Sequence, residues 1–321
     1  MRLGAAFNCA AARSLLAAGI LITSPASAAA PTQLSSNPAA ACASAGGTYL
    51  GDMKCQMPNG SVAPIMGSVQ PIVPGTDVVI GPTPSIPVAS GTPHAWALAT
   101  TAILFQFNGK QQDLLGGEIA TFEARVGGLK ILSQSWNVRD RNTLLSTLTW
   151  LQFAGHRQVF EELGNQVDLI SDAQFKEVET AAATRAALTG TGIGVISLEL
   201  ARRYHRSLAG KSILGWDLIR YIMLCRWGYL VGYLSEDEAW GRIMPAALRL
   251  QQTFSSWEEL QSNYLIGRMF WSVQQSETSG DRFKSVYDQL LADKTSPWNV
   301  NAWNMNLETA SAMPIAATKN P

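Results

Sequence analysis

Three histidines are the first residues to consider for chemistry, because imidazole can bind a metal ion or transfer a proton. His94, His156 and His205 are separated by roughly 50 to 60 residues and form no H-x-x-x-H or H-E-x-x-H pair. This spacing gives no indication of a metal site, and no cofactor motif is recognisable. His205 lies in the basic run 202–206, which fits either the end of a helix or an anion-binding patch.

Carboxylates are the next candidates. Asp217 and Arg220 interrupt an otherwise apolar stretch and, three residues apart, can form an ion pair on one face of a helix. Such a pair, if buried, either fixes the fold or marks a pocket. Glu238 could add a second acid, with His156 or Arg220 assisting, as in hydrolases that divide acid and base roles between two carboxylates. Glu238 also follows Ser235 by three residues, so helix capping already explains it.

Two further groups of residues suggest a binding surface. His156 lies in an apolar context and is either a base that needs partners or a structural histidine bonded to a backbone carbonyl. Tyr264, Arg268 and Trp271 recur at helical spacing, where Arg268 could stack on either ring. They belong either to the core and its rim or to a ligand site. The candidate binding set is His156, Trp216, Asp217, Arg220, Tyr264 and Arg268.

Helical periodicity dominates the part of the chain that must position these residues. All ten tryptophans follow Pro93, and strand signals there are few. Helices are expected at 95–107, 117–127, 143–163, 173–188, 193–208 and 216–231, and after Ser235 and Ser256. The sequence therefore predicts one all-α, multi-helix globular domain of about eight helices over residues 94–292. The irregular tail, 293–321, either folds back onto the domain or frays.

The first residues resemble a secretory signal peptide. Arg2 and Arg13 give a positive start, Leu15 to Ile22 an apolar stretch, and Ala26-Ser27-Ala28 a cleavage site. We expect residues 1–28 to be removed and the protein to be exported, to the periplasm or the medium. The remaining apolar stretches are too short or too charged for a transmembrane segment.

Residues 29–93 form a linker poor in charge, because ten of the 15 prolines but only three charged residues lie between Pro31 and Pro93. In an oxidising compartment we expect Cys42 and Cys55 to form a disulfide that closes a small hairpin. Residues 37–61 also resemble small cysteine-paired modules of exported bacterial proteins. Cys225, in an apolar helical pattern, is expected to be buried and inert.

Charge and composition exclude one class of partner and favour another. The 24 basic and 24 acidic residues cancel, which argues against a nucleic-acid partner. Abundant tryptophan and arginine without a recognisable catalytic set favour an interaction or ligand-binding module, whose partner is a protein or small molecule of the cell envelope. The alternative is an envelope-polymer hydrolase that uses Asp217, Glu238 and His156.

Several motifs bear a family resemblance. Residues 216–220 (WDLIR), 227–229 (WGY), 256–259 (SWEE) and 264–271 (YLIGRMFW), with 155–157 (GHR) upstream, resemble the bacterial domain-of-unknown-function family 1266 over about residues 94–275. The resemblance implies a mostly helical domain. It implies no activity, cofactor or catalytic residue.

Overall fold

The structure is a computed structural model that describes residues 48–51, 54–56, 62–64, 86–189, 194–208, 210–271 and 273–308. Three short strands come first: β1 (Thr48–Gly51), β2 (Lys54–Gln56) and β3 (Val62–Pro64). They form an antiparallel sheet of order β1-β2-β3, with Cys55 opposite Tyr49. The expected signal peptide and Cys42 lie outside the described residues, so the cleavage and the Cys42–Cys55 disulfide stay predictions.

Helices are the other regular elements of the described chain, as the all-α prediction requires. They are α2 (Pro93–Ala99), α3 (Ala102–Phe107), α4 (Phe122–Trp136), α5 (Arg141–Phe153), α6 (Arg157–Val167), α7 (Asp172–Thr189), α8 (Val195–Tyr204), α9 (Leu214–Leu230), α10 (Glu236–Thr253), α11 (Trp257–Trp271), α12 (Val273–Ala292) and α13 (Pro297–Val300). Within the described ranges, no helix has both the length and the apolar character that crossing a bilayer requires.

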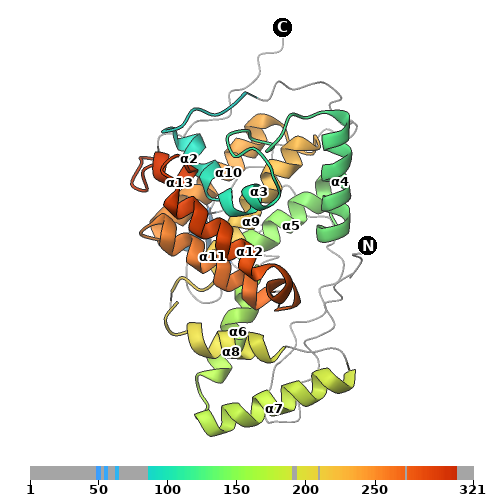
Figure 1. Cartoon of the computed structure of the whole chain (residues 1–321), viewed down its shortest axis with the longest axis vertical. Coiled ribbons are helices and arrows are strands. Elements are labelled where there is room, and N and C mark those ends of the chain that lie inside the picture. The colour runs from blue at the N-terminus through green and yellow to red at the C-terminus, as the bar shows by residue number, and fades with distance from the viewer. Residues whose placement is uncertain are drawn as a thin grey trace.

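Helix α9 is the centre of the domain. Nearly every residue from Leu214 to Leu230 is buried, as expected for a helix that is apolar on all sides. Figure 1 shows α9 behind α11 and α12, and it packs against α10, α11, α5 and α4. A polar group on α9 is therefore shielded from water by several neighbouring helices, which makes its pairing decisive for the fold.

Two of the expected helices are each divided in two. The expected helix 95–107 breaks after α2, where the hydroxyls of Thr100 and Thr101 donate to the carbonyls of Ala97 and Leu98. The expected helix 143–163 breaks between α5 and α6 at Gly155, whose φ of +61° lies in the left-handed region. Glycine adopts that conformation without the steric cost of a Cβ. The second break has a direct consequence for the candidate site.

The predicted helix start at Ser235 is confirmed, and Ser171 begins α7 in the same way. The Ser235 hydroxyl accepts from the N–H of Glu238, whose carboxylate accepts from the N–H of Ser235. Ser171 and Gln174 exchange the same pair of bonds at the start of α7. Each reciprocal pair satisfies donors that a helix N-terminus leaves unbonded.

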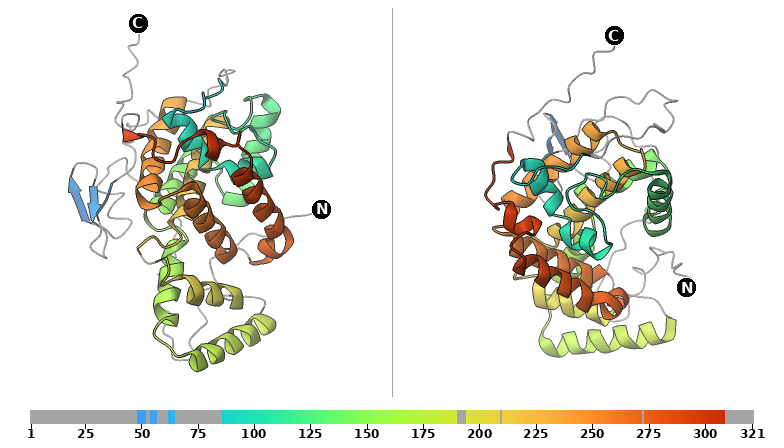
Figure 2. Two further views of the ribbon diagram at one scale, coloured as in Figure 1. Left: turned by 60° about the vertical axis from the view of Figure 1, so that its left-hand side comes forward. Right: turned by 45° about the horizontal axis from the view of Figure 1, so that its top comes forward.

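The periphery contains helix α12, which the sequence did not predict, and a tail that folds back. Figure 2 shows α6 and α8 at one end of the domain, with α7 outermost. Helix α12, in a polar stretch with weak periodicity, packs on α3 and α11. After it, the indole N–H of Trp298 donates to the Ala99 carbonyl, and the rings of Trp303 and Trp96 lie 5.1 Å apart. The described part of the tail, residues 293–308, therefore adds to the core.

Candidate functional site

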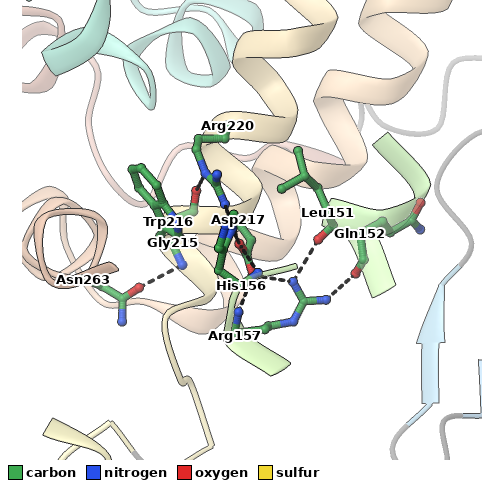
Figure 3. A network of polar contacts seen from close by, with 9 residues as sticks. All are labelled: Leu151, Gln152, His156, Arg157, Gly215, Trp216, Asp217, Arg220 and Asn263. Carbon is green, nitrogen blue, oxygen red and sulfur yellow. Dashed lines mark hydrogen bonds and ion pairs between the residues drawn. The ribbon is translucent and has the colours of Figure 1, made fainter. Parts of the chain in front are cut away.

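Asp217, in the first turn of α9, is fully buried and is the centre of a polar network (Figure 3). Its carboxylate accepts from the backbone N–H of His156 at 3.0 Å and from that of Arg157 at 3.1 Å. These N–H groups begin α6, where no side chain of the helix itself provides a cap. Asp217 thus caps α6 from 60 residues away, with its negative charge at the positive end of the helix dipole.

Two guanidinium groups complete the contacts of Asp217. Nη2 of Arg220 lies 2.8 Å from Oδ1, as the spacing of the two residues predicted, and Nη1 of Arg157 lies 3.0 Å from Oδ2. Each carboxylate oxygen therefore accepts two hydrogen bonds. A carboxylate with four charge-assisted or backbone donors and no exposure is a structural anion, without a free lone pair for a substrate proton.

Gly155 makes this arrangement sterically possible. A Cβ at this position would overlap the carboxylate group of Asp217. The positive φ turns the chain so that the next two N–H groups point at the same carboxylate. Both the space and the conformation therefore require glycine here.

Arg157 connects Asp217 to a third helix. In addition to the carboxylate, its guanidinium donates to the carbonyls of Leu151 at 2.8 Å and Gln152 at 2.6 Å. These carbonyls are among those that the C-terminus of α5 leaves without an intrahelical partner. The network of Asp217 and Arg157 thereby fastens α5, α6 and α9 at one point.

Arg220 connects Asp217 to His156 and to the aromatic residues. Its Nη2 lies 2.7 Å from Nδ1 of His156, its Nε donates to the Trp216 carbonyl, and its guanidinium carbon lies 3.9 Å from the centre of the Trp216 ring. Burial lowers the pKa of Arg220 to about 10, so it stays charged at neutral pH and must be the donor to His156.

His156 is consequently neutral, with a defined tautomer. Burial, followed by the charge of Arg220, lowers the pKa of His156 to about 2. Because Nδ1 accepts from Arg220, the ring proton is on Nε2. Rings of Trp150 and Trp271 lie edge-on to the imidazole, with centroids 5.0 and 6.1 Å away, and the His156 side chain keeps 24% of its surface exposed. The histidine is bonded to a side chain, not to a backbone carbonyl.

This pKa gives a testable pH dependence. In the native state His156 is neutral, whereas in the unfolded chain it binds a proton near its ordinary value of 6.5. Unfolding therefore takes up a proton below pH 6.5, and stability falls as the pH falls. Between pH 7 and 5 the wild type should lose about 2 kcal/mol more than His156→Gln. Urea denaturation of both proteins measures the difference, and equal losses would contradict a neutral His156.

The remaining members of the candidate binding set are packed in the core. Tyr264 lies with its ring 5.3 Å from that of Trp216, and burial raises the pKa of its phenol to about 12. Gly267 leaves room for Trp216, since a Cβ there would overlap that side chain. Arg268 stacks at 3.8 Å on Phe283 of α12, which corrects the expected stacking on Tyr264 or Trp271. The structure thus brings together His156, Trp216, Asp217 and Arg220, with Tyr264 beside Trp216.

Glu238 lies in a different network from Asp217. It accepts from Ser235 in the cap of α10 and forms an ion pair with Arg141, which also donates to the Tyr233 carbonyl just beyond the end of α9. Asp217 is 13 residues before that end. At 1.5 Å per residue the two carboxylates are about 20 Å apart along the helix. This separation is too large for two acids acting on one bond, and it argues against the Asp217–Glu238 acid pair.

His205 and Cys225 are also explained by their surroundings. His205 lies between Asp168, 2.7 Å from Nδ1, and Glu161, 3.2 Å from Nε2, so the basic run around it meets carboxylates of the protein itself. Cys225 is a free, fully buried cysteine, and burial raises the pKa of its thiol to about 12. Within the described residues, no group of three or more His, Cys, Asp or Glu side chains could hold a metal ion.

Comparison with known proteins places this network in a family. A model of the family described as "Protein of unknown function (DUF1266)" matches residues 131–303, more than half of the chain. The chain belongs to the DUF1266 family. All residues of the Asp217 network lie within the matched range, which begins and ends later than the resemblance over 94–275 indicated.

Two curated relatives of this DUF1266 protein come from Escherichia coli K12. It is 25% identical over 146 residues to each of the uncharacterized proteins YbeU and YbeR. The alignment covers 46% of this chain and 59% of each relative, so the chain spans well under two thirds of their length. No solved structure matches. The comparisons therefore establish the family and leave the activity open.

Sequence reasoning missed two members of the network. Gly155 and Arg157 were noticed only as neighbours of His156, because their partner Asp217 is about 60 residues away. Periodicity and spacing detect contacts within one helix, such as Asp217 with Arg220. The available signal was a glycine that interrupts a helical pattern and is followed by a basic residue, which indicates a positive-φ break with a nearby counter-charge.

Proposed function

We propose that this DUF1266 protein is an exported ligand-binding module and that His156 provides a hydrogen-bond donor to its ligand. The observation that carries the proposal is the fixed state of His156. Its Nδ1 is bonded to Arg220, its ring is neutral, and its Nε2–H has no hydrogen-bond partner among the described residues. A donor that is held in place before a ligand arrives does not have to be ordered on binding.

The surroundings of His156 suggest the chemistry of the ligand. Trp150, with 40% of its surface exposed, and Trp271 border the imidazole. The indole N–H of Trp216, whose ring is 6.4 Å from that of His156, is buried without an acceptor among the described residues. Apolar walls with a few convergent donors are typical of small-molecule sites. We infer a ligand with a flat apolar body and a hydrogen-bond acceptor.

A binding role is favoured over catalysis by the way the charged groups are used. Asp217 has no free acceptor site, and the pKa of His156 is too low for a base that works near neutral pH. The hydrolase alternative would therefore have to depend on residues outside this network. Turnover of envelope polymers that is lost in Glu238→Gln would revive it.

Export is the second part of the proposal and is supported by the signal-like sequence of residues 1–28. Expression of the full chain, followed by separation of cell compartments and N-terminal sequencing, tests it. A mature protein outside the cytoplasm that begins within two residues of Ala29 is expected. A full-length cytoplasmic protein would refute export without affecting the binding site.

A fragment screen with matched variants tests the binding site. Aromatic amides and lactams, which combine a flat ring with a carbonyl acceptor, would be screened by ligand-observed NMR against the wild type, His156→Phe and Trp150→Leu. Fragments that bind the wild type should lose at least about tenfold in affinity in both variants. His94→Phe is the control, because His94 packs on Trp240 in a different part of the domain. Equal binding to all four proteins, or none to the wild type, would overturn the proposal.

A further inference from the structure

Arg249, on α10, is a partly buried cation for which the described residues supply no counter-charge. Its Nη1 is shielded from water and has no hydrogen-bond partner, and no carboxylate of the described chain forms an ion pair with it. Burial of a guanidinium N–H without an acceptor costs about 1 to 3 kcal/mol. Proteins seldom keep such a group unless it has a task.

The position of Arg249 is next to the Asp217 network. The loop of residues 231–235 joins α9 to α10, and the two helices pack together in antiparallel orientation. Asp217 lies 13 residues before the end of α9, and Arg249 lies 13 residues after the start of α10. In an antiparallel pair of helices, the two residues are therefore at about the same height along the helix axes. The charged group that acts on Arg249 there is Arg157. Burial, followed by the charge of Arg157, lowers the pKa of Arg249 to about 10.

Asp217 cannot neutralise Arg249. Its four hydrogen bonds are all made to the first two N–H groups of α6 and to Arg157 and Arg220. Arg157 and Arg220 thus share this one carboxylate, and Arg249 adds a third guanidinium group within electrostatic range of Arg157. This leaves an excess of positive charge at the side of Arg249. A region of this kind attracts an anion, and a planar guanidinium matches the two oxygens of a carboxylate or phosphate.

We propose that Arg249 and Arg157 form an anion-binding subsite that takes an oxyanion, a carboxylate or a phosphate group, with Arg249 supplying the hydrogen bonds and Arg157 additional charge. The subsite is independent of the ligand proposed for His156. It explains why the protein keeps a buried guanidinium donor that its own described residues do not satisfy.

The inference predicts two effects of Arg249→Met, which has a similar length but no charge. First, inorganic phosphate or acetate should raise the Tm of the wild type by about 2 to 4 °C at saturation, and the variant should show no anion-dependent rise. Second, without these anions the variant should have a Tm equal to or above that of the wild type, because a buried donor without an acceptor has been removed. A purely structural arginine would give a lower Tm.

Thermal unfolding at constant ionic strength, with sodium chloride as the reference salt, measures both effects. Arg139→Met, at an exposed arginine, is the matched control and should keep the anion response. The phosphate and acetate arms identify the preferred oxyanion. Isothermal titration with phosphate, using Arg249→Gln as a second variant, keeps the test valid if Arg249→Met folds poorly. No response of the wild type beyond that to chloride, or an undiminished response of the variants, would overturn the inference.

Discussion

Asp217→Asn is expected to lower the free energy of unfolding by about 3 to 5 kcal/mol. The amide retains the size of the carboxylate but leaves Arg157 and Arg220 without a counter-charge in the interior. It also presents an NH₂ group to donors, where every present partner requires an acceptor. Loss on this scale is a large part of the stability of an ordinary domain.

Urea denaturation followed by circular dichroism measures this loss, and Asp288→Asn is the control. Asp288 forms an exposed ion pair with Lys284 one helical turn away, so its substitution should cost no more than about 0.5 kcal/mol. A second expected result is local: amide hydrogen exchange should speed up at the start of α6, which Asp217 caps. A loss of less than 1 kcal/mol would mean that water reaches the network and replaces the carboxylate.

The sequence predicted those features of the fold that depend on short distances along the chain. The central position of α9 followed from its apolar composition, and the reciprocal bonds of Ser235 with Glu238 followed from a spacing of three residues. The Asp217–Arg220 pair is of the same kind. In each case one helical turn brings the partners together, whatever the rest of the fold does.

Features that depend on contacts between distant segments were not predicted. Helix α12 has a weak apolar pattern, yet Phe283 on it provides the surface on which Arg268 stacks. The division between α5 and α6 at Gly155 is fixed by a carboxylate on α9. Neither partner can be found from local periodicity, because tertiary packing determines which side chains meet.

Arg249 and Arg226 illustrate the same limit for single residues. Both interrupt helical patterns as isolated arginines, and nothing near them in sequence distinguishes them. In the structure Arg249 has a buried donor without an acceptor, whereas every nitrogen of the Arg226 guanidinium has one. Removal of the charge is therefore expected to destabilise the protein at Arg226 but not at Arg249.

Arg226→Met is expected to lower the free energy of unfolding by about 3 kcal/mol or more. The fully buried guanidinium of Arg226 donates to the carbonyls of Leu114 at 2.8 Å and Leu115 at 3.0 Å, and to the hydroxyl of Thr101. It also lies 3.4 Å from the centre of the Phe105 ring. Removing the cation leaves several buried acceptors without donors, each costing about 1 to 3 kcal/mol, and this outweighs the relief from burying a charge.

Comparison of three substitutions separates the contributions of charge and geometry. Arg226→Lys keeps the charge but has three donors on one atom, which cannot span carbonyls in the turn before α4 and the Thr101 hydroxyl after α2. It should therefore lose about 2 kcal/mol, less than Arg226→Met, while Arg249→Met loses nothing. Chemical denaturation of the three variants gives the order directly. If Arg226→Met and Arg249→Met changed stability in the same direction and by the same amount, the satisfaction of their hydrogen bonds would not be what distinguishes these two arginines.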